Sequence, residues 1–309
     1  MMKEKQLIED NQNKNKTYNE IKEILIKGES YSKIKDYSKE RHRVITYYEV
    51  GKILFDAGKH YGEDIIGNFS KKLIIDVDKK FNKKKLFRIR QFYIVFKDQN
   101  VAQVARLSWS HYQELLPVKD ETERNYYLNR CIDNNLSRND LRKIKKDKEY
   151  ERLSKKTKEK LKNNKEVSLI ETIKDPILIE NKYVKEEIKE YELKNLILEN
   201  LDNFLSQLGE GYSYIANEYK IKLGDTYNYI DILLYNIKNN SYVVVELKVT
   251  ELKKENISQT KFYMNHIDEN IKEVNQNKTI GILIVKENNK YVLKYLYDKK
   301  ITSIEYVLI

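Results

Sequence analysis

The chain has 309 residues, of which 59 are Lys or Arg and 48 are Asp or Glu, so its formal net charge is +11 at pH 7. Its one cysteine, Cys131, excludes a disulfide framework and a cysteine-built zinc site, and no apolar run approaches the ~20 residues that span a bilayer. The polar N-terminal segment has no apolar signal-peptide core, so we expect a cytoplasmic protein without a membrane partner.

The first half of the sequence predicts helices. Residues 1–16 are polar and expected to be disordered, and residues 17–150 form a helical domain. Apolar residues at helical spacing form one stripe between Tyr31 and Phe55 and another between Ile65 and Ile75. Further helices are predicted to begin at the N-cap Asn82, at Ser110, at Thr122, and at Ser137 with Asp140 three positions later.

Two basic stretches lie in or next to this helical part. Lys79–Arg90 carries seven basic residues and no acidic one, and Arg142–Lys165 carries twelve basic and four acidic residues. Nucleic-acid phosphates would neutralise such clusters, whereas a solvated helix face or a disordered tether is the structural alternative. Short helices with a basic face resemble a helix-turn-helix unit, although a plain helical interaction domain fits the pattern as well. The predicted DNA-binding residues are Lys83, Lys84, Lys85, Arg88, Arg90, Arg142, Lys143, Lys145 and Lys146.

The second half predicts a different architecture. Residues 151–184 are interpreted as a basic, polar linker, and residues 185–208 as a helix. From residue 209 on, the apolar pattern changes from the helical period to the alternation of strands. This order predicts a mixed α/β domain with a central sheet over residues 185–309. Its strands are predicted at 214–223, 227–237, 242–249, 279–285 and 291–297, with a helix at 258–274.

Two of these strands carry charges inside apolar runs. Asp231 interrupts one, while Glu246 and Lys248 lie two positions apart on the next, hence on the same side. Because an isolated buried charge is costly, these groups need partners. A turn within 236–240 would make the two strands a hairpin. One register pairs Asp231 with Glu246, and a register shifted by one residue in the turn pairs it with Lys248.

Either register predicts the same candidate chemistry. Two facing carboxylates repel unless a cation lies between them, and hard oxygen ligands with open positions suit Mg²⁺. A neighbouring lysine can orient a water molecule and stabilise charge on a phosphate undergoing attack. The alternative, which the spacing alone leaves equally open, is a buried ionic cluster of Asp231, Glu246 and Lys248 without catalysis.

At these residues the sequence resembles the PD-(D/E)XK nuclease superfamily, because Asp231 is followed by Glu246-Leu-Lys248. The surrounding stretches Asn228–Tyr235, Ser258–Met264 and Thr279–Val285 resemble the nuclease domain of the YhcG family. Tyr48-Glu-Val-Gly51, Ile89-Arg-Gln-Phe-Tyr93 and Leu107-Ser-Trp-Ser-His-Tyr112 resemble motifs of that family's N-terminal helical domain. The chain departs from the family pattern at Ala216-Asn-Glu218, Ser258 and Tyr48.

The resemblance implies an α+β multidomain protein, with an all-α, helix-turn-helix-like N-terminal domain and an α/β restriction-endonuclease-like C-terminal domain. It further implies that Asp231, Glu246 and the main-chain carbonyl of Leu247 bind Mg²⁺ or Mn²⁺, that Lys248 positions water, and that Gln259 supports the site. An acidic residue on the first helix, Glu192 or Glu199, would complete it.

Together these observations predict a metal-dependent endonuclease that hydrolyses DNA phosphodiester bonds. The resemblance further implies a homodimer and a restriction or phage-defence setting. The alternatives are a catalytically silent DNA- or partner-binding protein on a nuclease scaffold, and an RNase.

Overall fold

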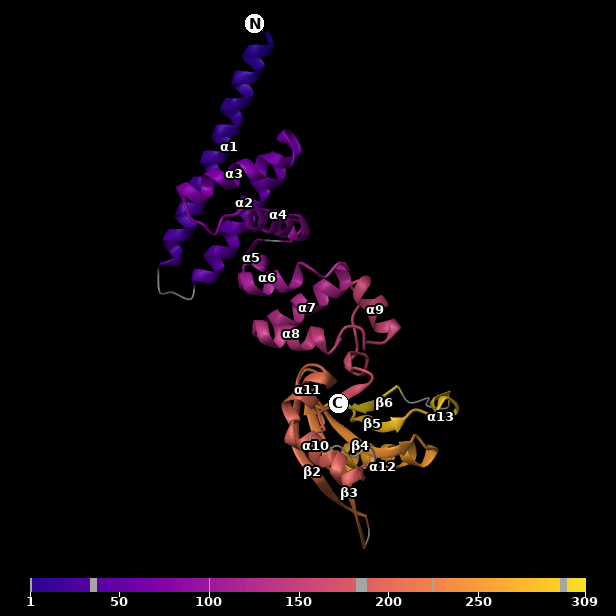
Figure 1. The fold of residues 1–309 in the computed structure, drawn as a ribbon. Coiled ribbons are helices and arrows are strands. Elements are labelled where there is room, and N and C mark those ends of the chain that lie inside the picture. The colour runs from indigo at the N-terminus through magenta and orange to yellow at the C-terminus, as the bar shows by residue number, and fades with distance from the viewer. Residues whose placement is uncertain (1, 34–37, 100, 182–187, 224, 295–298) are drawn as a thin grey trace. The chain divides into compact units, whose positions relative to one another are not determined.

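The computed structural model describes residues 2–33, 38–99, 101–181, 188–223, 225–294 and 299–309 (Figure 1). The chain divides into two compact units, residues 1–147 and 148–309. Among the described helices, none combines the length and the apolar character needed to cross a membrane.

Unit 1, residues 1–147, is built from helices, as the sequence predicts. Its described helices are α1 (Met2–Ser32), α2 (Ser38–Tyr61), α3 (Asp64–Asp76), α4 (Lys83–Phe96), α5 (Val101–Val104), α6 (Trp109–Leu115), α7 (Glu121–Asp133) and α8 (Arg138–Lys146).

The core of unit 1 is aromatic where α2, α4 and α6 meet. The ring of Phe92 on α4 lies 4.6 Å from that of Tyr112 and 5.3 Å from that of Trp109, both on α6. Gly51 on α2 allows α4 to approach closely, because a Cβ atom there would lie 2.6 Å from the carbonyl oxygen of Ile89. The apolar stripe predicted for α2 is therefore a packing surface.

The ends of several helices test the capping predictions. Asn82 and Ser137 cap α4 and α8 as predicted, and Ser137 forms a capping box with Asp140. Ser108 is the N-cap of α6, two residues before the predicted Ser110, and α7 begins at Glu121 after the N-cap Asp120, one residue before the predicted Thr122.

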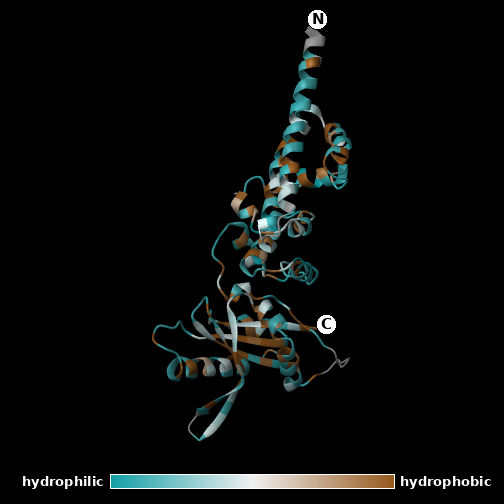
Figure 2. Ribbon diagram, turned by 90° about the vertical axis from the view of Figure 1, so that its left-hand side faces the viewer, coloured by the Kyte–Doolittle hydropathy of each residue, from teal (hydrophilic) through white to brown (hydrophobic). Residues whose placement is uncertain are grey.

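The start of α1 differs from the sequence prediction. Residues 2–16 are helical rather than disordered, because they continue a helix whose later residues Tyr18, Ile21 and Leu25 are buried. The side chains of residues 6 and 8–16 are mostly exposed, and this part of α1 is mostly hydrophilic (Figure 2).

Unit 2, residues 148–309, is a mixed α/β domain, again as predicted. Its sheet has the strand order β1-β6-β5-β4-β3-β2. Strands β2, β3 and β4 are antiparallel neighbours, while β4, β5, β6 and β1 pair in parallel. Its described elements are α9 (Lys155–Lys162), η1 (Ile170–Thr172), β1 (Ile177–Ile179), α10 (Glu190–Glu199), α11 (Leu201–Leu208), β2 (Tyr212–Leu223), β3 (Thr226–Asn236), β4 (Ser241–Glu251), α12 (Lys254–Asn270), β5 (Ile280–Glu287), α13 (Lys290–Lys294) and β6 (Ile301–Leu308).

Two apolar cores cover the two faces of this sheet. Leu193 and Ile197 of α10 and Phe204 of α11 pack with strand residues that include Val245 and Ile282. Residues of α12 pack with a second set of strand residues. The sheet is thus a layer between helices, and the central strands β4 and β5 are apolar on both sides, as the brown ribbons in Figure 2 show.

Two segments of unit 2 differ from the prediction. The predicted linker over residues 151–184 contains α9 and β1, and β1 is an edge strand that pairs with β6. The strand predicted at 291–297 is wrong at its start, because residues 290–294 form α13, while residues 295–298 lie outside the described residues. The last strand is Ile301–Leu308, which continues the sheet beyond β5.

Candidate active site

The candidate site lies where strands β3 and β4 separate. Their ladder runs from the turn to the pair Ile232–Val245. Beyond that pair β3 continues only with β2, while β4 continues with β5. The observed register is the one of the two predicted registers that places Asp231 across from Glu246.

Beyond this pair, hydrogen bonds between main-chain N–H groups and side-chain carboxylates replace the main-chain hydrogen bonds between β3 and β4. The main-chain N–H of Leu247 donates to Oδ2 of Asp231 at 2.9 Å. The main-chain N–H of Asp231 points at Oε1 of Glu246, 3.4 Å away. In a strand the N–H and C=O of one residue point to the same side, so the carbonyl of Leu247 also faces the gap that β3 leaves. Both carboxylates and this carbonyl therefore meet at one place.

The two carboxyl groups lie close to each other, with Glu246 buried and Asp231 half-buried. Glu246 is only 2% exposed, and burial together with the negative charge of Asp231 raises the pKa of Glu246 to about 8. Burial also raises the pKa of Asp231, opposed by the Leu247 N–H and by the positive charges of Lys248 and Lys194. A pair of neighbouring acids that disfavours double ionisation is a setting that a bound cation would stabilise.

Lys248 brings a positive charge to this pair, and its partner is an acid that the sequence analysis did not select. Its Nζ lies 3.2 Å from a carboxylate oxygen of Glu190, the first residue of α10. The two candidates named from the sequence lie elsewhere. Glu192 accepts a hydrogen bond from the main-chain N–H of Lys189 at 2.8 Å, and Glu199 ends the helix.

A second lysine of α10 was missed by sequence reasoning. Lys194 is buried, its ammonium pairs with Glu218 of β2 at 2.5 Å, and its charge favours the ionised form of Asp231. Glu190 and Lys194 are one helical turn apart, so the i,i+4 spacing was the available signal. Glu218 stands at the family departure Ala216-Asn-Glu218 and has a positive φ of 48°.

Gln259 lies on α12, one turn before a tyrosine that borders the site. Its Nε2 donates to the hydroxyl oxygen of Tyr263 at 2.8 Å. Burial raises the pKa of Tyr263, and the negative charges of Glu246 and Asp231 act in the same direction. The structure therefore connects Gln259 to the site through Tyr263, a residue that the sequence analysis did not single out.

The donor set fits a hard divalent cation. The described residues contain no group of three or more His, Cys, Asp or Glu side chains placed to hold a metal ion. Asp231 and Glu246 supply two carboxylates, and the Leu247 carbonyl supplies a third oxygen. A Mg²⁺ ion that keeps several waters needs no larger protein donor set.

Some of the basic residues predicted to bind DNA already contact other groups of the protein, whereas others are exposed. Lys85 of α4 is half-buried and packs against aromatic rings, with its Nζ 4.3 Å from the ring centre of Tyr47 and 4.4 Å from that of Trp109. Burial and the neighbouring charges of Arg43 and Arg88 lower the pKa of Lys85 to about 8. Its ammonium is thus used in packing rather than displayed at the surface.

Other members of this set already have acidic or carbonyl partners. Arg90 pairs with Glu63. On α8, Arg142 donates to the Glu114 carboxylate at 2.8 Å, and Lys145 donates to the Glu114 main-chain carbonyl. Arg88 is half-buried on α4, and Lys143 lies in the last turn of α8. The exposed lysines of the set are Lys83, Lys84, Lys143 and Lys146.

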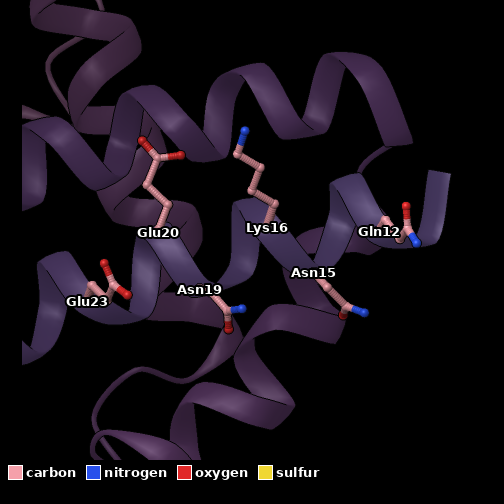
Figure 3. Close-up of a pocket in the computed structure, with 6 residues that line it drawn as sticks. All are labelled: Gln12, Asn15, Lys16, Asn19, Glu20 and Glu23. Carbon is pink, nitrogen blue, oxygen red and sulfur yellow. The ribbon is translucent and has the colours of Figure 1, made fainter. Parts of the chain in front are cut away.

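One hollow in unit 1 contains none of these residues. It follows the surface of α1 and is lined by six polar residues of that helix (Figure 3). All six side chains come from one exposed helix, so this hollow brings together no groups from different elements. The lining residues are Gln12, Asn15, Lys16, Asn19, Glu20 and Glu23.

A mixed sheet with helices on both faces, and an Asp–Glu–x–Lys set where two of its strands separate, define a nuclease domain of the PDDEXK class. In agreement, residues 170–308 match the YhcG PDDEXK nuclease domain, and residues 20–152 match the DUF1016 N-terminal domain. These two matches together cover most of the chain, with the helical domain first and the nuclease domain second. The chain belongs to the YhcG family.

Known proteins give further similarities. A protein of Escherichia coli (strain K12) named "Putative nuclease YhcG" is 22% identical over 285 residues, which cover 78% of this chain and 76% of that protein.

Among solved structures, a repair endonuclease from Pyrococcus abyssi is similar at 26% identity with a TM-score of 0.28, over 41% of this chain and 49% of that one. EndoMS in a complex with double-stranded DNA is similar at 20% identity with a TM-score of 0.29, over 42% and 48%. The chain thus spans about half the length of these solved structures.

Proposed function

We propose that this chain is a metal-dependent endonuclease that hydrolyses DNA phosphodiester bonds. The observation that carries the proposal is the meeting of Asp231, Glu246 and Lys248 where β3 leaves β4. Where the main-chain ladder ends, the gap contains the buried acid Glu246, the half-buried acid Asp231, a main-chain carbonyl and an ammonium group. This set combines groups that bind a cation with one that orients water, as phosphodiester hydrolysis requires.

Asp231, Glu246 and the Leu247 carbonyl would hold Mg²⁺ or Mn²⁺. When bound, such an ion supplies Lewis-acid stabilisation of the charge that develops on the phosphate oxygens. The hydrogen bond from the Leu247 N–H fixes the orientation of the Asp231 carboxylate. Because Glu246 is buried, its carboxylate is held in one place rather than sampling solvent.

Lys248 would position the attacking water. Its ammonium is mostly buried and is held by Glu190, so it can donate to a water molecule or to a phosphate oxygen without a large rearrangement. Water adds to phosphorus, one phosphorus–oxygen ester bond breaks, and the products are a phosphate monoester and a hydroxyl.

DNA as the substrate is supported by the exposed lysines among the predicted DNA-binding residues of unit 1, which are Lys83, Lys84, Lys143 and Lys146. The sequence from Glu190 onward holds fifteen basic and seventeen acidic residues, so the nuclease domain alone offers little attraction for a polyanion. A homodimer and a restriction or phage-defence setting complete the proposal, and sedimentation of the purified chain tests the dimer.

The direct test is cleavage of supercoiled plasmid DNA with Mg²⁺, with and without EDTA. We expect nicking that EDTA abolishes and that Glu246→Ala reduces at least a hundredfold. Glu269→Gln, a change of an exposed acid on α12, is the matched control and should cleave like wild type. Equal nicking by wild type and Glu246→Ala would refute the proposal. Cleavage of RNA but not of plasmid would instead identify an RNase.

A further inference from the structure

The hairpin of β2 and β3 continues beyond the rest of the sheet. Past Ile232–Val245, β3 has only β2 as a neighbour, and the pairs continue through Lys220–Tyr229 and Lys222–Tyr227 to Leu223–Thr226. Figures 1 and 2 show this hairpin extending away from the other strands. We call residues 219–223 and 226–230 the hairpin arm.

One side of the hairpin arm carries tyrosines and lysines. Tyr227 and Tyr229 are 51% and 50% exposed, and their cross-strand partners are Lys222 and Lys220. The opposite side contains Ile221 and Ile230, which are buried against residues of α12 and its preceding loop. One side of the hairpin arm is therefore packed against the domain, and the other side is exposed to solvent.

The hairpin arm leads directly into the candidate active site. Tyr227 and Tyr229 share one side of β3 within the arm, and the same strand then supplies Asp231 to the site. Tyr229 precedes Asp231 by two residues, which is about 7 Å along a strand. That spacing is close to the length of one nucleotide in an extended strand.

The two tyrosines have different surroundings. The Nζ of Lys220 lies 3.7 Å from the ring centre of Tyr227, so this ring holds an ammonium group at the surface of the arm. Tyr229 is the exposed ring nearest to Asp231 along the strand. At the base of the arm, Glu218 is paired with Lys194, so its negative charge is largely offset.

From this arrangement we propose that the hairpin arm binds an unpaired stretch of the DNA strand that is cut, with a base stacked on Tyr229 and a phosphate on Lys220. The inference rests on the proposed nuclease function and adds a substrate class, DNA that is single-stranded beside the cleaved bond. Exposed tyrosines with interleaved lysines form the kind of platform on which unpaired bases stack. Bases within a duplex are stacked on each other and have no free face to offer.

The test uses the full-length protein in EDTA, so that binding is measured without cleavage. Fluorescence anisotropy compares a labelled single-stranded oligonucleotide with the same sequence as a duplex. We expect Tyr229→Leu to weaken single-strand binding about tenfold and duplex binding less than twofold. Tyr229→Phe should bind like wild type, because it keeps the ring.

Two further variants control for general effects. Tyr291→Leu removes an exposed tyrosine of α13, and Lys299→Gln removes a lysine that precedes β6; both should bind like wild type, whereas Lys220→Gln should weaken binding. Unchanged single-strand binding by Tyr229→Leu, or an equal loss on duplex and single strand, would overturn the inference. Wild-type protein that binds and cuts duplex alone would also overturn it while leaving the nuclease proposal intact. Wild-type protein that neither binds nor cuts DNA would refute the nuclease proposal itself.

Discussion

The ammonium group of Lys248 lies 3.2 Å from the carboxylate of Glu190, an ion pair that joins β4 to the first residue of α10. The pair is partly buried, since the Lys248 side chain is only 14% exposed. Because Lys248 lies beside Asp231 and Glu246, its partner Glu190 is the acid of α10 that is connected to the candidate site.

The Lys248–Glu190 ion pair predicts that substitutions of its two members reduce DNA cleavage to different extents. Lys248→Met should reduce plasmid nicking at least a hundredfold, because it removes the group that orients water. Glu190→Gln should reduce nicking about tenfold, because the lysine remains but loses its partner. Glu192→Gln, a change two residues along on the same helix, should leave the rate unchanged. A loss with Glu192→Gln as large as with Glu190→Gln would contradict this assignment.

The pKa of Glu246 predicts how stability depends on pH in the absence of metal. The unfolded chain releases this proton near the ordinary value of 4.5, whereas the folded protein keeps it until about pH 8. The folded state is therefore progressively destabilised by this group as pH rises between these values, and the penalty is complete above pH 8.

Glu246→Gln removes that penalty. In EDTA at pH 8.5 the variant should melt about 5 °C above wild type, and the difference should shrink toward zero as pH falls to 4.5. Adding Mg²⁺ should raise the melting temperature of wild type but not that of the variant. A difference between the two proteins that is independent of pH would show that Glu246 is ionised throughout.

The surroundings of the α4 lysines predict different effects on DNA binding. Neutralising the exposed pair with Lys83→Gln and Lys84→Gln should reduce the salt dependence of binding by about two units of slope in log K against log salt. Lys85→Met should leave the slope unchanged, because its ammonium lies over Tyr47 and Trp109. A reduced slope for Lys85→Met would place that ammonium on DNA.

Two glycines of unit 1 provide a matched pair for stability. Gly51→Ala should destabilise the unit by about 1–3 kcal/mol, since the new Cβ would lie 2.6 Å from the Ile89 carbonyl oxygen. Gly67→Ala on α3 should stabilise it by about 0.5–1 kcal/mol, because the nearest atom to its Cβ is a Lys83 side-chain carbon at 3.6 Å. Denaturant unfolding of both variants measures the two changes.

Much of the fold could be predicted because the relevant signals are local. The caps Asn82 and Ser137, the apolar stripe of α2 and the alternation in β3 and β4 depend on residues close in sequence. The register that faces Asp231 with Glu246 follows from the turn and was one of two predicted. The short edge strand β1 and the helix α13 were missed, because runs of three to five residues carry no distinguishing period.

The partners at the site were harder to predict, because they depend on how α10 is placed against the sheet. Glu190, Glu192 and Glu199 are equivalent in sequence terms, and only the orientation of the helix selects Glu190. Lys85 illustrates the same limit in unit 1, since a basic residue in a basic run gives no sign that aromatic rings of α2 and α6 enclose it.

The predicted linker turns out to support the nuclease domain. Lys174 and Glu149 form a buried ion pair at 3.1 Å, and Arg152 donates to the carbonyl of Pro176 and to the side chain of Gln207. An excised fragment that started at residue 170 would leave the Lys174 ammonium in the interior without Glu149, and it would lose the hydrogen bonds of Arg152 to Pro176 and Gln207. The compact unit that contains the nuclease domain therefore begins near residue 148, well before the first residue of the family's nuclease match.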